Sequence, residues 1–200
     1  MKTLQKIFLW MAVISLVASC NKTEEYAEDE DLQLKSMQTM EVTVPFYANF
    51  IGDYVGLFLP GDEGFECDPM FNCRVLVDAQ GTATHLGKFT VHFDFCACGP
   101  DDPEIEGTDQ QYGPTEVCLV AANGDKLFVS CGGSVVDGRL PHHPEDVSSY
   151  WRDPFVITGG TGKFEGATGG GLTDDYNRDS FPANSFHHWR GNITLKKGKP

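Results

Sequence analysis

The side chains best suited to chemistry in this chain are its six histidines, four of which stand in adjacent pairs. His142 and His143 lie in a proline-rich loop over 139–146, and His187 and His188 lie in a strand-like stretch. Adjacent residues of a strand point to opposite faces, so such a pair rarely binds one metal ion. We therefore predict no metal site.

The remaining candidates for chemistry are isolated. His85 and His92 fall in one strand-like run, 82–98, where His85 could face an interior as an acid or base, although a structural histidine is the commoner case. The acidic segment 99–106 could bind Ca²⁺, but its carboxylate spacing matches no EF-hand loop, so we interpret it as a solvated loop. No Gly-x-Ser-x-Gly nucleophile elbow occurs. The sequence identifies no catalytic residue and no cofactor.

A glycine-rich segment, 157–171, invites comparison with phosphate-binding loops. A P-loop requires glycine five places before Gly162 and serine or threonine after Lys163, but the chain has Ile157 and Phe164 there. The dinucleotide fingerprint fails as well, because Glu165 stands where its last glycine belongs. We interpret the segment as a turn followed by a strongly bent strand, in which glycines allow close backbone approach.

The first 19 residues have the pattern of a signal peptide. Lys2 and Lys6 precede an apolar run, 7–18, that is too short to span a bilayer comfortably. The run ends at Val17-Ala18-Ser19-Cys20, which resembles the lipobox of bacterial lipoproteins. The resemblance implies export and lipidation of Cys20, and two or more acyl chains hold a protein firmly at a membrane. An ordinary secretory leader with an incidental Cys20 is the alternative.

The chain is strongly acidic. Removing the leader, which holds two lysines and no acid, takes the net charge from −14 to −16. Such a surface repels phosphate backbones, so nucleic acid is not an expected partner. Six acidic residues within 24–31 cannot pack, which predicts a flexible tether over 20–39. Its position resembles the acidic export signal of some surface lipoproteins, with a solubilising spacer as the alternative.

Asn21 stands where an aspartate would resemble the signal for retention at the inner membrane. We therefore expect a lipid anchor in the outer membrane, with the protein on its periplasmic or cell-surface face.

Setting Cys20 apart leaves an even number of cysteines, which favours disulfides in an exported chain. The six candidates are Cys67, Cys73, Cys96, Cys98, Cys118 and Cys131. Cys118 and Cys131 flank a turn and could be cross-strand neighbours, while Cys67 and Cys73 could close a loop. Those pairings would leave Cys96 with Cys98, two residues apart on one strand and near the limit of disulfide span. We therefore expect Cys96 and Cys98 to bond to two different partners. A zinc site is the competing interpretation of these cysteines, but the sequence contains no Cys-x-x-Cys pair.

Residues 40–200 are predicted to form one all-β domain of about eight strands. The strand-like stretches are 41–50, 74–77, 82–98, 116–120, 126–129, 154–157, 163–173 and 185–196, with a turn over 78–81. Asn123-Gly124 between two apolar runs is a strong hairpin signal. Phe89, Val91, Phe93 and Phe95 fall on one face. This pattern favours an antiparallel barrel or sandwich.

The glycine-rich segment also carries a family resemblance. Its motif, Gly159-Gly160-Thr161-Gly162-Lys163-Phe164 followed by Gly166, resembles the G-G-T-G-[KR]-F segment of dirigent and allene-oxide-cyclase-like barrels. Segments 84–90 and 121–128 are similar to those of bacterial members. The resemblance implies an eight-stranded antiparallel β-barrel over roughly 41–196. Plant members cyclise an epoxide or steer radical coupling, but their lumen residues do not map onto this chain position by position.

An eight-stranded barrel is just wide enough for side chains or one small ligand. We therefore expect an exported barrel that binds a small apolar ligand or a protein partner in its mouth or loops. Two alternatives are a cyclase or isomerase with a polar residue in the lumen, and a structural envelope lipoprotein. A buried carboxylate or histidine in a wide lumen would favour the enzyme. A lumen filled by phenylalanine would exclude both ideas that depend on the lumen.

Overall fold

The computed structural model describes residues 40–100, 109–179 and 184–196. The chain divides into two units, Met1–Thr39 and Met40–Pro200, and only the second contains described residues. The predicted signal peptide, lipidated Cys20 and acidic tether, and most of the acidic segment 99–106, therefore lie outside the described residues. Among the residues that are described, no helix is long and apolar enough to cross a membrane.

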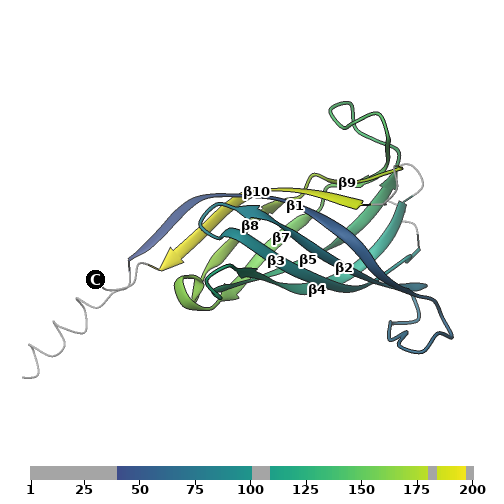
Figure 1. Ribbon diagram of the computed structural model, residues 1–200, viewed down its shortest axis with the longest axis horizontal. Coiled ribbons are helices and arrows are strands. Elements are labelled where there is room, and N and C mark those ends of the chain that lie inside the picture. The colour runs from purple at the N-terminus through teal and green to yellow at the C-terminus, as the bar shows by residue number, and fades with distance from the viewer. Residues whose placement is uncertain (1–39, 101–108, 180–183, 197–200) are drawn as a thin grey trace, which may run out of the picture. The chain divides into compact units, whose positions relative to one another are not determined.

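The described residues form one antiparallel sheet that closes on itself (Figure 1). Its elements are β1 (Glu41–Phe58), β2 (Cys73–Ala83), β3 (Gly87–Ala97), β4 (Asp109–Ala121), β5 (Lys126–Asp137), β6 (Val147–Trp151), β7 (Pro154–Gly160), β8 (Thr168–Leu172), β9 (Asp175–Arg178) and β10 (Asn184–Lys196). Strands β1 and β10 pair from Glu41↔Lys196 to Asp53↔Asn184, which joins the first strand to the last.

Two of the barrel's eight continuous strands are each interrupted once. The pairs Pro154↔Leu172 and Trp151↔Asp175 keep one register, so β6 continues into β7, and β8 continues into β9. Counted this way, the described residues form a closed antiparallel barrel of eight strands, which confirms the predicted fold class.

The turns before and after the second half of β2 differ from the sequence prediction. The turn expected over 78–81 is wrong, because β2 runs straight through it with Ala79 buried between β1 and β3. The single run 82–98 is also wrong: the chain turns at Thr84–Leu86, where His85 has a φ of 64°. Pairing on both edges outweighs the local turn propensity of 78–81.

The Asn123-Gly124 hairpin is confirmed. Gly124 has a φ of 89°, and its N–H donates to Ala121 O. The register next to the turn pairs Cys118 with Phe128 and Thr115 with Cys131. A bulge between Tyr112 and Thr115 shifts the register only beyond these pairs. The expectation that Cys118 and Cys131 are cross-strand neighbours is therefore wrong.

The disulfides follow from register and strand face. The structure forms Cys67–Cys96 and Cys73–Cys98, so Cys96 and Cys98 do bond to different partners, and the suggested Cys67–Cys73 loop is wrong. Cys118 and Cys131 are free thiols, since Cys131 is buried on the inner face of β5 while Cys118 occupies the alternate face of β4. Cys67–Cys96 joins the segment before β2 to the end of β3, and Cys73–Cys98 joins the first residue of β2 to the residue after β3.

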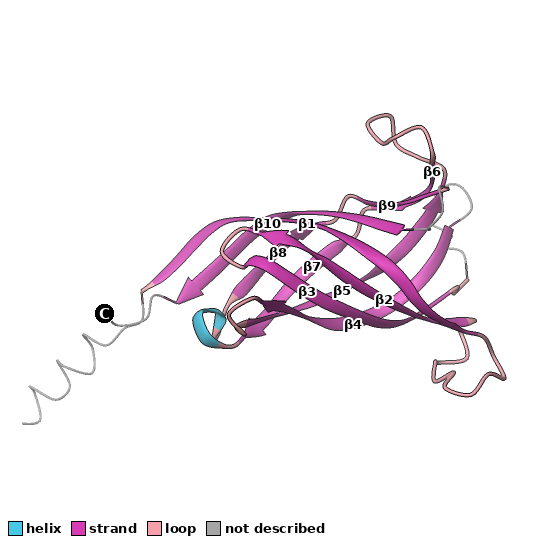
Figure 2. Cartoon of the chain, viewed as in Figure 1, coloured by secondary structure: helices cyan, strands magenta, loops and turns pink. Residues whose placement is uncertain are grey.

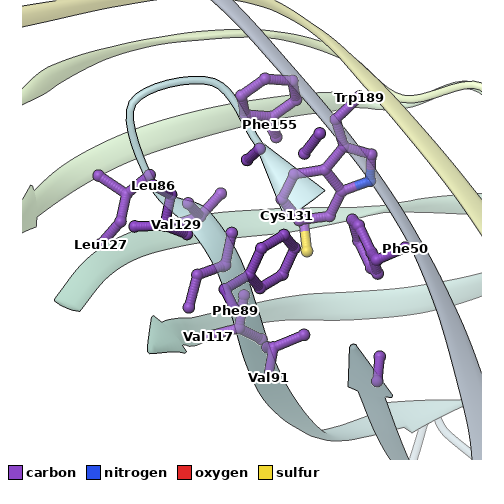
Figure 3. Close-up of a cluster of buried hydrophobic side chains, with 14 of the residues drawn as sticks. Phe50, Leu86, Phe89, Val91, Val117, Leu127, Val129, Cys131, Phe155 and Trp189 are labelled. Atoms are coloured by element: carbon purple, nitrogen blue, oxygen red, sulfur yellow. The ribbon is translucent and has the colours of Figure 1, made fainter. Parts of the chain in front are cut away.

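The buried hydrophobic side chains form one cluster inside the barrel (Figure 3). Phe89, Val91 and Phe93 are buried on one face of β3, as the alternation predicted. The glycine-rich motif closes one end of the barrel with a single 3₁₀ turn, η1 (Gly162–Phe164). Phe164 points inward and has no exposed surface, whereas Glu165 is exposed. Figure 2 shows this turn at the end of the barrel opposite β6 and β9. The strand predicted over 163–173 therefore begins only at Thr168.

Candidate functional site

The other end of the barrel is hollow. A cavity of about 210 Å³ opens there, with Tyr54 and Leu57 of β1 exposed at its entrance. Its walls are mainly apolar and include Val77, Phe93 and Trp189. Apolar side chains such as Phe164 fill the end of the lumen near η1, and the cavity lies at the other end. A cavity with one entrance, apolar walls and a few polar groups is the usual form of a small-molecule site.

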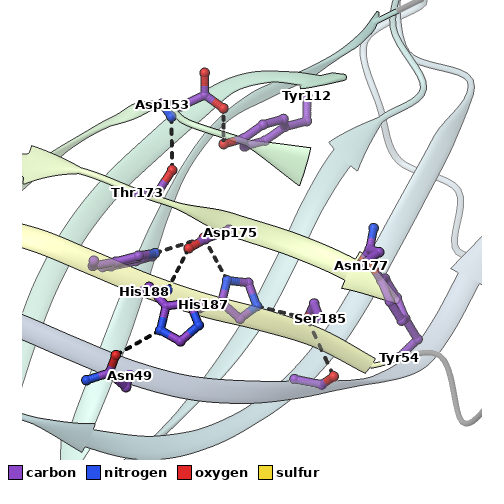
Figure 4. Close-up of polar contacts among 12 residues, drawn as sticks. Asn49, Tyr54, Tyr112, Asp153, Thr173, Asp175, Asn177, Ser185, His187 and His188 are labelled. Atoms are coloured by element: carbon purple, nitrogen blue, oxygen red, sulfur yellow. Dashed lines mark hydrogen bonds and ion pairs between the residues drawn. The ribbon is translucent and has the colours of Figure 1, made fainter. Parts of the chain in front are cut away.

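Asp175 is the central polar residue of the cavity wall, and it is 1% exposed. Its Oδ2 accepts hydrogen bonds from Trp189 Nε1 (3.0 Å) and from His187 Nδ1 (2.8 Å), and its Oδ1 accepts one from the backbone N–H of His188 (2.9 Å). Three donors compensate the burial of this carboxylate, which would otherwise be costly. They also fix its orientation toward the imidazole of His187 (Figure 4).

His187 joins Asp175 to a hydroxyl. Its Nε2 lies 2.8 Å from Ser185 Oγ, and both residues line the cavity at 6% and 2% exposure. The ring stacks on Phe50, with centroids 4.3 Å apart and planes 6° from parallel. Ser185 and His187 are two residues apart on β10 and therefore share the inner face. The arrangement is a Ser–His–Asp chain of hydrogen bonds in an apolar lumen.

A second carboxylate, Asp153, is partly buried in the link between β6 and β7. Its Oδ2 accepts from Tyr112 Oη (2.9 Å) and from the N–H of Ser134 (3.3 Å). A Cβ on Gly133 would overlap this carboxyl, so glycine is required opposite it. Burial, reinforced by the charge of Asp175, raises the pKa of Asp153, and burial likewise raises that of Tyr112, which lines the cavity.

The raised pKa of Asp153 predicts a specific pH dependence of stability. The folded carboxyl keeps its proton at pH values where the unfolded one, with an ordinary pKa of 3.8, has lost it. The contribution of Asp153 to the free energy of unfolding therefore falls as pH rises from about 3.8 through the higher folded pKa. Asp153→Asn removes this penalty, so the variant should gain stability relative to the wild type as pH rises above about 3.8. Urea unfolding at several pH values measures the difference.

The matched control is Asp137→Asn, which removes an exposed carboxyl at the end of β5. A difference between Asp153→Asn and the wild type that is constant with pH would contradict the assignment. So would the same pH-dependent gain in both variants, because it would come from net charge and not from burial.

The histidines singled out by sequence lie mostly outside the lumen. His85 is exposed in the β2–β3 turn, with Nε2 3.2 Å from Pro45 O, so a lumen role for it is wrong. His92 is exposed and bonds to Asp78 (2.7 Å). His187 and His188 do face opposite sides: His187 points inward, whereas His188 Nδ1 lies 2.8 Å from Asn49 Oδ1.

His142 and His143 behave differently because they lie in a loop, where strand alternation does not apply. Both Nε2 atoms reach Asp174, at 2.8 and 3.3 Å, and the three residues could in principle surround a metal ion. However, the N–H of Leu140 donates to His143 Nδ1 (3.3 Å), so Nε2 carries the proton and donates to Asp174. A metal would need that lone pair, and Arg152 Nε is a further 3.6 Å neighbour of the same carboxylate. The cluster is therefore best described as a hydrogen-bonded contact between the 139–146 loop and Asp174.

No sequence pattern marks Asp153, Asp175 or Ser185 as a site residue. Asp153 and Asp175 lie just outside the predicted strands 154–157 and 163–173, although Asp153 continues the alternation of Phe155 and Ile157. Ser185 lies inside the predicted strand 185–196 and alternates with His187, but strand periodicity gives only its face and not its partners.

A more open groove of about 370 Å³ lies beside the Cys67–Cys96 disulfide. Its only cation, Arg74, already binds Asp94 (2.6 Å) and the carbonyl of Gly64 (2.6 Å). The remaining lining includes Glu66 and Asp68. Among the described residues that line this open groove, the one basic side chain is already paired and the others that carry charge are acidic. The more enclosed, mainly apolar lumen cavity is therefore the better candidate site.

No protein-family model matches the chain, and no curated protein sequence matches it. Among solved structures it is similar to two pterocarpan synthase dirigent proteins, GePTS1 and PsPTS1. The first is 14% identical over 80% of this chain and 93% of its own, with a TM-score of 0.47. The second is 14% identical over 80% and 97%, with a TM-score of 0.42. The barrel assignment rests on the strand pairing above, and the site on its own geometry.

Proposed function

We propose that the barrel binds a small, largely apolar molecule in its lumen cavity. The observation that carries the proposal is the combination of an apolar wall with one fixed polar cluster, Asp175, His187 and Ser185, at its inner side. Apolar burial supplies affinity, and a few fixed polar groups supply orientation.

The cavity also limits what the ligand can be. Its volume of about 210 Å³ lies below the range of about 300–1,000 Å³ typical of drug-sized sites, which favours a molecule of one or two rings. Asp175 and the charge of −14 on the chain disfavour an anion. A neutral molecule with one hydroxyl or carbonyl group directed at Ser185 and His187 fits best.

Filling the cavity tests the proposal. Ala97 lines the cavity at the end of β3, and Ala97→Trp should occupy the space while the strand pairing remains. With 2-naphthol as a neutral probe, calorimetry should show binding to the wild type and at least about tenfold weaker binding to the variant, which corresponds to about 1.4 kcal/mol. The matched control is Ala122→Trp in the exposed β4–β5 turn. Equal affinity of both variants, or no binding to the wild type, would overturn the proposal.

A second candidate function is proton transfer, as in a cyclase or isomerase. The observation that favours it is the partly buried Asp153, whose pKa is raised by burial and whose partner Tyr112 lines the cavity. A carboxyl whose pKa is raised holds its proton to higher pH than an ordinary aspartate does, which suits it to act as a general acid. Turnover that is lost in Asp153→Asn but kept in Ser185→Ala would favour this candidate.

We also propose that the protein is exported and anchored in the outer membrane through Cys20. Its support is the leader and lipobox pattern, together with two disulfides, which are typical of an oxidising compartment. Cys20→Ser should abolish incorporation of labelled palmitate in a lipoprotein-processing host and release the protein from membranes. A variant that remains lipidated would contradict the anchor.

A further inference from the structure

We propose that Ser185 is a nucleophile and that the lumen site transfers acyl groups from small neutral esters to water. The inference rests on the proposed function, since the ester must first enter the cavity. It concerns three residues, Ser185, His187 and Asp175, which no motif in the sequence marks as a catalytic set.

With a neutral imidazole, the hydrogen-bond chain has one consistent direction. Asp175 already accepts from an indole N–H and a backbone N–H, so it acts as an acceptor toward His187 as well. His187 must therefore carry its proton on Nδ1, which leaves Nε2 with a lone pair. That lone pair lies 2.8 Å from Ser185 Oγ, so the hydroxyl donates to it. A serine that donates to a histidine oriented by a carboxylate is the arrangement of an activated serine nucleophile.

The surroundings hold this chain in place. His187 cannot rotate freely, because its ring stacks on Phe50 and its two nitrogens are both bonded. The other acceptor available to the Ser185 hydroxyl is Gly52 O, at 3.5 Å, which is the longer and weaker contact. The apolar lining of the cavity strengthens the electrostatic interactions of the three groups.

The chemical step balances with water as the second substrate. Ser185 Oγ attacks the ester carbonyl and forms a C–O bond, while His187 Nε2 takes the hydroxyl proton. The bond to the leaving oxygen breaks, and Nε2 gives it that proton, so an alcohol leaves. Water then attacks the acyl-serine, again with Nε2 passing a proton, and a carboxylic acid departs as Ser185 is restored. Asp175 is the positioning residue.

The cavity also holds donors for the negative oxygen of the intermediate. The side-chain amides of Gln110 and Asn177 line it together with Ser185. The Asn177 Nδ2 donates to Ser149 Oγ (3.1 Å) and retains a second N–H. Hydrogen-bond donors directed at such an oxygen are a principal source of rate enhancement in acyl transfer.

Diisopropyl fluorophosphate tests the nucleophile directly, because it is small and neutral and phosphorylates activated serines with loss of fluoride. The full-length protein should gain one label, on the peptide that contains Ser185, and 2-naphthol should slow the reaction. Ser185→Ala should remove the label, and Ser130→Ala, a serine elsewhere on the barrel, should not. Asp175→Asn should slow labelling at least about a hundredfold at neutral pH and change the pH profile of the labelling rate, because His187 loses the carboxylate that fixes its tautomer, a change that a purely structural role would not produce.

The outcomes separate the two proposals. A folded wild type that binds 2-naphthol but takes no label on Ser185 would overturn acyl transfer and leave the binding function intact. A wild type that neither binds nor reacts would overturn both. Labelling that persists in Ser185→Ala, or that proceeds equally in denatured protein, would also overturn the assignment of Ser185.

Discussion

Asp175→Ala is expected to lower the free energy of unfolding by about 3–5 kcal/mol, because it leaves several buried hydrogen-bond donors without an acceptor, each at a cost of about 1–3 kcal/mol. The substitution leaves His187 Nδ1, Trp189 Nε1 and the N–H of His188 without their acceptor inside the barrel. Each buried donor without a partner is itself costly. Urea unfolding followed by tryptophan fluorescence measures the loss, and Trp189 reports it directly because it contacts the carboxylate.

The matched control is Asp174→Ala, one residue earlier. Asp174 lies outside the lumen and bonds to His142 and His143 of the loop, with its side chain 28% exposed. Its removal should cost about 1 kcal/mol, as for surface ion pairs. If the two variants were equally stable, the lumen network would not be a major source of stability. The site would then owe its geometry to the surrounding strands alone.

Gly191→Ala is expected to open the seam between β8 and β10. A Cβ on Gly191 would lie 2.0 Å from Gly170 O and 2.7 Å from Gly171 Cα, both backbone atoms that no side-chain rotation can move away. Strand β8 would have to separate from β10 or the barrel would have to expand. We expect a loss of about 3 kcal/mol or more, at or above the upper end of overpacking costs.

The control for this seam is Asn192→Ala, the exposed neighbour on the same strand. It introduces the same side chain without a close backbone contact, so its effect should lie within about 0.5 kcal/mol of the wild type. Similar unfolding midpoints for Gly191→Ala and Asn192→Ala would show that the barrel tolerates expansion. Amide exchange of β8 in the two variants would then locate the change.

The first expectation concerns the hollow end of the barrel, and the second concerns the close backbone contact between β8 and β10. Phe164 and the apolar residues around it close the end near η1. The polar network occupies the other end, where the strands extend past the apolar core. Stability therefore comes largely from one end of the lumen and the candidate chemistry from the other.

The sequence by itself determined the fold class. Alternation of Phe89, Val91 and Phe93, the Asn123-Gly124 turn and the glycines around Gly162 each act locally, through side-chain period and backbone φ, so they can be recognised without knowing any partner strand. The even number of cysteines similarly indicated disulfides but not their pairing.

Only the tertiary structure decided the pairing and the site. Cys73 bonds to Cys98, not to Cys67, because the register of β2 against β3 places it beside the end of β3. Asp175 and Ser185 belong to separate strands, and their meeting at His187 depends on the register between β9 and β10. Local pattern reveals which face a residue occupies, whereas register, set by closure of the whole barrel, determines which residues on that face meet.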